Sequence, residues 1–106
     1  MDRILVTGAN GFIGGAVARL LAEYGFEVFG LDRQKPAGLA ADASWIDLDL
    51  TAEQARTQLD SLPRFDAVVH CAAVIPNSFT GPAAEQARQA NASMDEQIIE
   101  FCRDRG

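Results

Sequence analysis

The stretch Val6-Thr7-Gly8-Ala9-Asn10-Gly11-Phe12-Ile13-Gly14 joins a short apolar run, Arg3 to Val6, to a helical pattern of apolar residues. Three glycines spaced three apart separate the two patterns, and the periodicity changes from strand to helix across them. Gly8 would let the chain turn off the strand, Gly11 would let the backbone approach a pyrophosphate, and Gly14 would let the helix lie close to the sheet. The unpaired N–H groups at the start of the helix would then face an anion. The stretch therefore predicts a phosphate-binding turn.

The run from Thr7 to Gly14 resembles the T-G-x-x-G-F-I-G signature of extended short-chain dehydrogenases/reductases, the family of NAD-dependent epimerases and dehydratases. Its glycine spacing, G-x-x-G-x-x-G, differs from the commonest dinucleotide fingerprint, G-x-G-x-x-G. The resemblance implies an α/β fold of the Rossmann type, with a parallel sheet in strand order 3-2-1-4 and helices on both faces. It covers nearly the whole chain but only the opening part of the family's usual length. The pyrophosphate-binding residues that it implies are Gly8, Gly11, Phe12, Ile13 and Gly14, and Asn10 is also expected to be a cofactor-binding residue.

Composition limits the kind of protein. With 106 residues, 48% of them hydrophobic, the chain can form one small core and no more than one domain. A net charge of −6 argues against binding to nucleic acid or to an anionic membrane surface, because the field would repel phosphates. No apolar run reaches membrane-spanning length and no signal peptide is present, so we expect a cytoplasmic protein. Cys71, Cys102 and the single histidine lack metal-ligand spacing, and both cysteines are expected to be small buried hydrophobes without a disulfide.

The first helix is predicted directly after the glycine turn, with Gly25 as its C-terminal cap. Arg19 and Glu23 fall on its polar side. The apolar residues that recur at helical spacing, and that are expected to pack on the sheet, are Phe12, Ile13, Ala16, Val17, Leu20 and Leu21.

Asp32 follows the predicted second strand, Glu27 to Leu31, and lies 18 residues beyond Gly14. A dinucleotide fold carries at this place an acid that accepts hydrogen bonds from the adenosine ribose hydroxyls. A carboxylate favours NAD, since it would repel the 2′-phosphate of NADP. Arg33 could hold that phosphate if the loop turned inward, so NADP stays open as the less favoured cofactor. Residues 34–44 predict an irregular connection.

A third strand is predicted at residues 45–48. The resemblance implies that the Asp-Leu pair after it, Asp49 and Leu50, lies near the adenine amine, with Asp47 as the rival carboxylate. Asp49 could also simply help to start the next helix. The sequence Thr51-Ala52-Glu53-Gln54 has the form of a capping box and predicts a short helix, stopped by Pro63. The residues expected to face the sheet from this helix are Ala55, Leu59 and Leu62.

The apolar run Ala67–Ala73 is typical of a strand buried on both faces. It resembles the V-x-H-x-A-A segment of the same family, where two alanines, here Ala72 and Ala73, lie beside the cofactor and leave room for the inner ribose. His70 is expected to be a hydrogen-bonded core residue rather than a catalytic one. Beyond the strand, Asn77, Ser78 and Thr80 could touch a substrate or could only solvate a loop.

A long helix is predicted from Pro82 to Arg105, with Gly106 as its cap. Asn91 lies within its apolar stripe, so we expect its amide to bond to the backbone of the neighbouring strand. The segment resembles the family's N-V-x-G-T-x-N-L-L-E-A-A but departs from it at Met94, Asp95 and Gln97. In that family the asparagine supports the helix and a water near the catalytic lysine. The stripe consists of Ala84, Ala87, Met94, Ile98 and Phe101.

Hydride transfer in the resembled family depends on a Tyr-x-x-x-Lys pair, in which the lysine lowers the pKa of the tyrosine. The only tyrosine of this chain is Tyr24, and no such pair exists. The sequence therefore predicts no catalytic residue and no metal ligand. Residues 1–106 are interpreted as the N-terminal part of a Rossmann NAD(P)-binding domain that is inactive alone and lacks a substrate domain.

Two functions are compatible with these features. The first is the NAD-binding portion of an epimerase/dehydratase-type oxidoreductase whose small-molecule substrate is a nucleotide sugar. The second is a non-catalytic NAD(P)-sensing module of the atypical short-chain dehydrogenase kind, and a structural remnant without cofactor affinity is a third possibility. We also expect self-association, through the open edge of the Ala67–Ala73 strand or through the Pro82–Arg105 helix.

Overall fold

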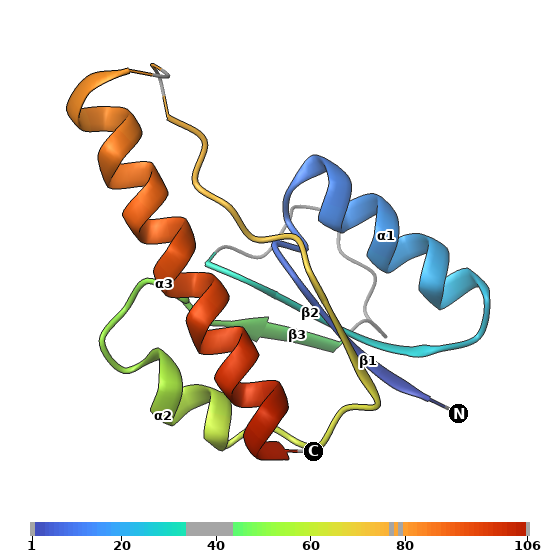
Figure 1. The fold of residues 1–106 in the computed structure, drawn as a ribbon. Helices are drawn as coiled ribbons and strands as arrows, with labels where there is room; N and C mark the ends of the chain where they lie inside the picture. The colour runs from blue at the N-terminus through green and yellow to red at the C-terminus, as the bar shows by residue number, and fades with distance from the viewer. Residues whose placement is uncertain (1, 34–43, 77, 79, 106) are drawn as a thin grey trace.

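The computed structural model describes residues 2–33, 44–76, 78 and 80–105. The predicted irregular connection, Asn77 and the predicted cap Gly106 therefore lie wholly or largely outside the described residues. The elements in chain order are β1 (Arg3–Thr7), α1 (Phe12–Glu23), β2 (Glu27–Asp32), β3 (Ser44–Asp47), α2 (Ala55–Asp60), β4 (Ala67–His70) and α3 (Gly81–Arg105) (Figure 1).

The four strands form one parallel sheet in the order β3-β2-β1-β4. Thr7, the last residue of β1, pairs with Leu31 on one side and with His70 on the other, so the carboxyl ends of three strands meet at one edge. The predicted strand order is confirmed. The fold is an α/β fold of the Rossmann type, in which ligands bind at this edge, beyond the strand ends.

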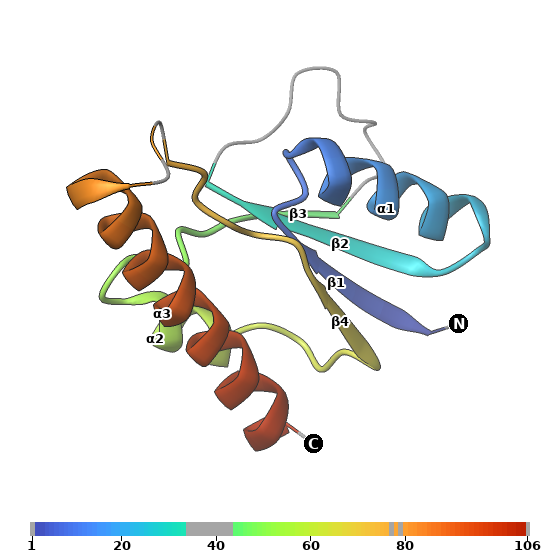
Figure 2. The ribbon, with the colours of Figure 1, turned by 45° about the horizontal axis from the view of Figure 1, so that its top comes forward.

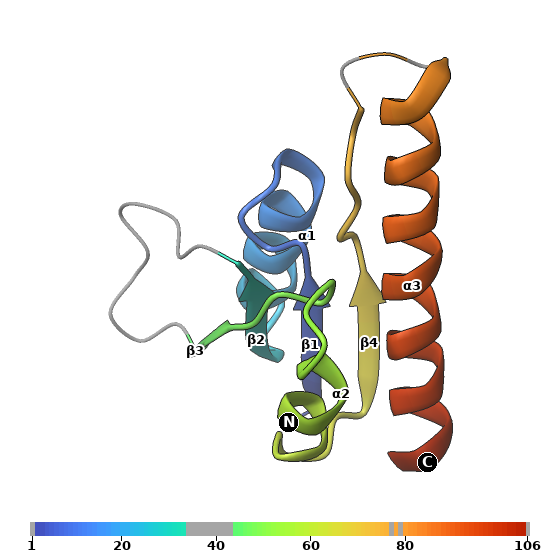
Figure 3. The ribbon, with the colours of Figure 1, turned by 90° about the vertical axis from the view of Figure 1, so that its left-hand side faces the viewer.

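Helices cover both faces of the sheet, as predicted (Figure 2). Successive residues of β1 point to opposite faces. Leu5 packs on one face with Leu59 of α2 and Phe101 of α3, whereas Ile4 and Val6 pack on the other face, against α1. Figure 3 shows α3 running alongside β4, which is the last strand of the sheet.

The predicted packing of α1 is partly wrong. Val17, Ala18 and Leu21 pack against the sheet, but Phe12 is 95% exposed. The other predicted residues that are exposed are Ile13, Ala16 and Leu20. The apolar residues cover a wider arc of the helix than the sheet can reach, and Phe12 and Ile13 lie in the first turn, beyond the strand ends.

The end of α1 is as predicted. Gly25 has a φ of +92°, and its N–H bonds to the carbonyl of Ala22 while that of Phe26 bonds to the carbonyl of Leu21. This pair of bonds is the Schellman motif, which satisfies carbonyl groups that the helix end would leave free.

The predicted capping box is wrong. The backbone N–H and the hydroxyl of Thr51 both donate to Asp49 Oδ1, at 2.9 and 2.6 Å, so Thr51 closes a local turn instead of capping a helix. The helix begins later, at Ala55, and its N-cap residue makes no side-chain capping bond. Ala55 and Leu59 are fully buried, and Leu62 packs against the same core, as predicted.

The strand β4 is shorter and less buried than predicted: it ends at His70, and its residues are half-buried or exposed because it forms the sheet edge. In contrast, the buried stripe of α3 is confirmed at Ala87, Met94, Ile98 and Phe101, with Ala84 half-buried. Cys71 is half-buried, but Cys102 is exposed, which corrects the expectation for that residue. Both thiols are free. No described helix is long and apolar enough to cross a membrane.

Candidate cofactor site

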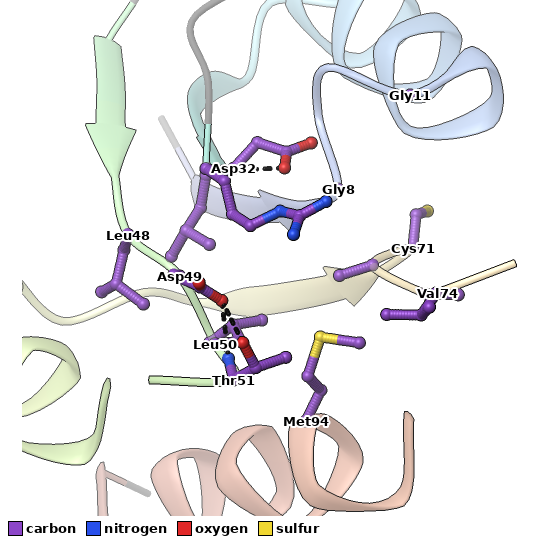
Figure 4. A pocket seen from close by; sticks show the side chains of 14 residues that line it. Gly8, Gly11, Asp32, Leu48, Asp49, Leu50, Thr51, Cys71, Val74 and Met94 are labelled. Carbon is purple, nitrogen blue, oxygen red and sulfur yellow. Dashed lines mark hydrogen bonds between the residues drawn. The ribbon is translucent and has the colours of Figure 1, made fainter. Parts of the chain in front are cut away.

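An open cleft lies at the carboxyl edge of the sheet, where the turn after β1, the end of β2, the segment after β3 and the segment after β4 meet (Figure 4). Its cavity volume is about 120 Å³, below the roughly 300–1,000 Å³ of an enclosed small-molecule site, so it is a shallow cleft open to solvent. The residues that line it are Gly8, Gly11, Leu31, Asp32, Arg33, Leu48, Asp49, Leu50, Thr51, Cys71, Ala72, Ala73, Val74 and Met94.

The glycine turn is packed as closely as its sequence suggests. Gly8 has a φ of +67°, and a Cβ there would lie 2.7 Å from the backbone nitrogen of Ala72, so only glycine fits between the turn and the segment after β4. A Cβ on Gly14 would lie 2.1 Å from the carbonyl oxygen of Gly8. Gly14 therefore brings α1 against the turn itself, not against the sheet as the sequence analysis expects.

The first turn of α1 presents free hydrogen-bond donors. Its N-cap residue, Gly11, has no side chain to cap it. Within the described part of the chain, the N–H groups of Phe12, Ile13 and Gly14 have no hydrogen-bond partner. Asn10 differs, because its N–H donates to Asp32 Oδ2 at 3.0 Å. The positive end of a helix with unpaired N–H groups is suited to bind an anion.

Asp32 lies at the end of β2 and lines the cleft. Its two carboxylate oxygens accept hydrogen bonds from the N–H of Asn10, at 3.0 Å, and from the N–H of Arg33, at 2.7 Å. These two bonds fix the carboxylate between the glycine turn and the end of β2. Each oxygen keeps a further lone pair that can accept a bond from a ligand hydroxyl.

Asp49 lies in the segment after β3, lines the cleft and is held by Thr51 (Figure 4). The hydroxyl of Thr51, its backbone N–H and the charge of Arg33 lower the pKa of Asp49 below its ordinary value of 3.8, although partial burial opposes them. The carboxylate is therefore ionised at neutral pH. The rival, Asp47, does not line the cleft, and its Oδ1 accepts a bond from the indole N–H of Trp45 at 2.7 Å.

The structure adds a group of lining residues that the sequence analysis did not place in the site. Met94 reaches into the cleft from α3 and is 5% exposed, although the sequence assigned it only to the core (Figure 4). The sequence places Met94 in the apolar stripe of α3, and this pattern does not indicate that the helix lies beside a cleft at that residue. The other additions are Leu31, Leu48, Thr51, Cys71 and Val74.

Eight of the twelve predicted cofactor residues line the cleft. Those that do not are Asn10, Phe12, Ile13 and Gly14, which lie at the start of α1 beside it. Ser78 and Thr80 do not line it either, and their hydroxyl groups lie 3.4 Å apart.

The segment after β4, which forms one wall of the cleft, is held by polar side chains, of which Thr7 is buried and Asn91 and His70 are half-buried. The side chain of Asn91 accepts a bond from the N–H of Val74 at 2.6 Å and donates one to its carbonyl at 3.0 Å, which confirms that this amide bonds to backbone. The hydroxyl of Thr7 accepts bonds from the N–H groups of Cys71 and Ala72, at 3.1 and 3.3 Å. His70 is hydrogen-bonded on both ring nitrogens, as expected, but it is half-buried on the end strand of the sheet and does not lie in the core. No group of three potential metal ligands occurs among the described residues.

The strand order, the glycine turn and the cleft beyond the strand ends define an α/β protein of the Rossmann class. The chain belongs to the NAD-dependent epimerase/dehydratase family, whose family model matches residues 4–106. The sequence resemblance is thereby confirmed.

Two relatives illustrate the family match. An uncharacterized protein of Mycobacterium tuberculosis is 40% identical over 71 residues, which are 66% of this chain and 8% of that protein. The dTDP-4-dehydro-6-deoxy-D-allose reductase of Streptomyces bikiniensis is 37% identical over 83 residues, which are 71% of this chain and 26% of that enzyme. The chain thus spans well under half the length of these relatives.

Solved structures show the same fold. The UDP-Glc/GlcNAc 4-epimerase of Campylobacter jejuni matches with a TM-score of 0.83 and 25% identity, over 100% of this chain and 35% of that one. A short-chain dehydrogenase/reductase superfamily protein of Agrobacterium tumefaciens with bound NAD matches with a TM-score of 0.71 and 26% identity, over 93% of this chain and 28% of that one.

Proposed function

We propose that this chain binds NAD and provides the cofactor-binding part of an oxidoreductase of the epimerase/dehydratase family that acts on a nucleotide sugar. The observation that carries the proposal is the set of three free N–H groups, on Phe12, Ile13 and Gly14, beside a cleft that holds two anchored carboxylates. Free amides at a helix start suit a diphosphate, and carboxylates suit ribose hydroxyls and a purine amine.

The diphosphate would lie over the glycine turn. Gly8 and Gly11 line the cleft there, and the absence of side chains lets an anion reach the helix amides. The N–H of Asn10 is already bonded to Asp32, so Asn10 contributes by holding that carboxylate.

The adenosine would lie between β2 and the segment after β3. Asp32 would accept bonds from the ribose hydroxyls, and Asp49 would accept one from the adenine amine. The purine would rest on the apolar side of the cleft, where Leu50 and Met94 are nearly fully buried. Burial of a flat aromatic ring against such side chains is favourable.

The inner ribose would lie beside Ala72 and Ala73, which line the cleft after β4. NAD is favoured over NADP because a 2′-phosphate would lie against the carboxylate of Asp32. Arg33, which also lines the cleft, is the group that could offset this repulsion.

The nucleotide-sugar substrate is supported by the names of two matched proteins, a dTDP-sugar reductase and a UDP-sugar epimerase. This chain contains no Tyr-x-x-x-Lys, so hydride transfer would need residues outside it. A Tyr-x-x-x-Lys later in the parent gene supports an oxidoreductase, whereas its absence there supports the alternative, a non-catalytic NAD(P) sensor.

Self-association is part of the same proposal. β4 is the end strand of the sheet, and an open strand edge can pair with a second copy. The exposed face of α3 is the other candidate surface. Light scattering at increasing concentration should show a dimer, and a monomer at every concentration would contradict this part.

Calorimetric titration of the 106-residue chain with NAD and NADP tests the proposal. Asp32→Ala should weaken NAD binding by roughly 10- to 100-fold, since hydrogen bonds to a charged group contribute about 1.5–3 kcal/mol. Asp47→Ala is the matched control, because Asp47 lies outside the cleft, and it should bind like the wild type. An absence of heat with either cofactor would contradict the function. Equal affinities of wild type and Asp32→Ala would remove Asp32 from the site.

A further inference from the structure

The segment after β4, residues 71–74, forms one wall of the cleft, and Thr7 attaches this wall to the sheet. It is fully buried at the end of β1, and its hydroxyl oxygen accepts bonds from the N–H groups of Cys71 and Ala72. The same hydroxyl lies 2.6 Å from Nδ1 of His70. Nε2 of His70 lies 2.9 Å from Oδ1 of Asp95 on α3.

The hydrogen positions in this chain of bonds follow from the donor and acceptor count. A hydroxyl has one hydrogen and two lone pairs. The lone pairs of the Thr7 hydroxyl face two backbone N–H groups, that of Ala72 and that of Cys71, which is shared with the Thr7 carbonyl oxygen at 3.2 Å. Its hydrogen therefore points to Nδ1 of His70. Nδ1 must then accept, and the neutral ring carries its proton on Nε2, where it is donated to the carboxylate of Asp95.

We propose that His70 and Asp95 are positioning residues of the cofactor cleft. Asp95 selects the ring form of His70 that accepts from Thr7, and this leaves both lone pairs of the hydroxyl free to hold Cys71 and Ala72. The cofactor part of this inference rests on the proposed function, whereas the hydrogen-bond arrangement does not.

The wall that these residues hold has no room to move toward the glycine turn. A Cβ on Gly8 would lie only 2.7 Å from the backbone of Cys71 and Ala72, so the two backbones are already in contact. A loss of the bonds to Thr7 would therefore let Ala72 move outward and widen the cleft.

The helix α3 fixes the wall at two points. Asn91 holds Val74, and Asp95, one turn later on the same side of the helix, holds His70. Asp95 is also a position at which this sequence departs from the segment that it resembles. These hydrogen bonds give His70 and Asp95 a role, although neither residue lines the cofactor cleft.

The ring form can be measured directly because His70 is the only histidine. A two-bond ¹H–¹⁵N correlation spectrum of the labelled chain at neutral pH should show one pyrrole-like nitrogen, Nε2, and one pyridine-like nitrogen, Nδ1. A proton on Nδ1, or equal occupancy of both nitrogens, would overturn the proposal.

Asp95→Ala tests the consequence, with Glu96→Ala as the matched control on the next, also exposed, position of α3. We expect Asp95→Ala to lose the fixed ring form, to exchange the amide hydrogen of Ala72 several-fold faster, and to bind NAD about three- to tenfold more weakly. The amide of Cys71 keeps its bond to the Thr7 carbonyl and should change less. Glu96→Ala should match the wild type in all three measurements.

If Asp95→Ala does not fold, Asp95→Asn replaces it, because its amide oxygen can still accept from Nε2 and should keep the ring form and the slow exchange. Unchanged exchange in Asp95→Ala, or a lost ring form in Asp95→Asn, would overturn the proposal. A wild type with the predicted ring form but no affinity for NAD would contradict the proposed function and leave the hydrogen-bond arrangement standing.

Discussion

Gly14→Ala is the substitution that tests the packing of the glycine turn most severely. The added Cβ would lie 2.1 Å from the carbonyl oxygen of Gly8, whereas ordinary contacts begin at 3.4 Å, so the two backbones would have to separate by more than 1 Å. Neither atom belongs to a flexible side chain. Overpacking of this kind costs about 1–3 kcal/mol.

Gly15→Ala is the matched control for this substitution. It brings the same gain in helix propensity, up to about 1 kcal/mol, but its Cβ would lie 3.2 Å from the carbonyl oxygen of Ala9 and needs a much smaller adjustment. The difference between the two variants therefore isolates the contact between α1 and the turn.

Urea denaturation followed by circular dichroism should show Gly14→Ala to be less stable than Gly15→Ala by about 1–3 kcal/mol. Calorimetry should also show a loss of NAD affinity for Gly14→Ala only, because the displaced turn no longer aligns the helix amides. Equal stability and equal NAD affinity of the two variants would refute the close packing of Gly14 against Gly8.

Two further substitutions test the walls of the cleft. Thr51→Val removes the hydroxyl that lowers the pKa of Asp49. The depressed pKa stabilises the folded state above pH 3.8 and ceases to do so as the pH falls through the folded-state pKa. The variant should therefore be about 0.5–1.5 kcal/mol less stable at neutral pH and should lose this deficit in acid; a deficit that is independent of pH would contradict the link. Asn91→Leu leaves the N–H and the carbonyl of Val74 unpaired and should cost about 1–3 kcal/mol in urea denaturation, whereas a change below roughly 0.5 kcal/mol would show that water replaces the amide.

The parts of the fold that the sequence predicted are those in which local chemistry and burial agree. The turn at Gly8 and the cap at Gly25 each need a positive φ, and the stripe of α3 has a helical period. These three features are confirmed. The capping box predicted at Thr51 is wrong because the same sequence is compatible with a turn. The hydrogen bond from the Thr51 hydroxyl to the carboxylate of Asp49 favours the turn.

The limits of the site prediction have a similar cause. Asp32, Asp49 and Ala72 follow strand ends, and parallel strands bring their carboxyl ends to one edge, so their convergence could be predicted. Met94 could not be placed in this way, because it reaches the cleft from α3, far along the chain from the strand ends. The bond from His70 to Asp95 spans 25 residues and carries no sequence signal of its own.

A crystal structure of the chain with NAD tests the central claim most directly. The account predicts that the diphosphate lies within hydrogen-bond distance of the N–H groups of Phe12, Ile13 and Gly14, with the adenosine ribose on Asp32. A cofactor bound elsewhere on the chain, or a diphosphate held by side chains away from the start of α1, would contradict it.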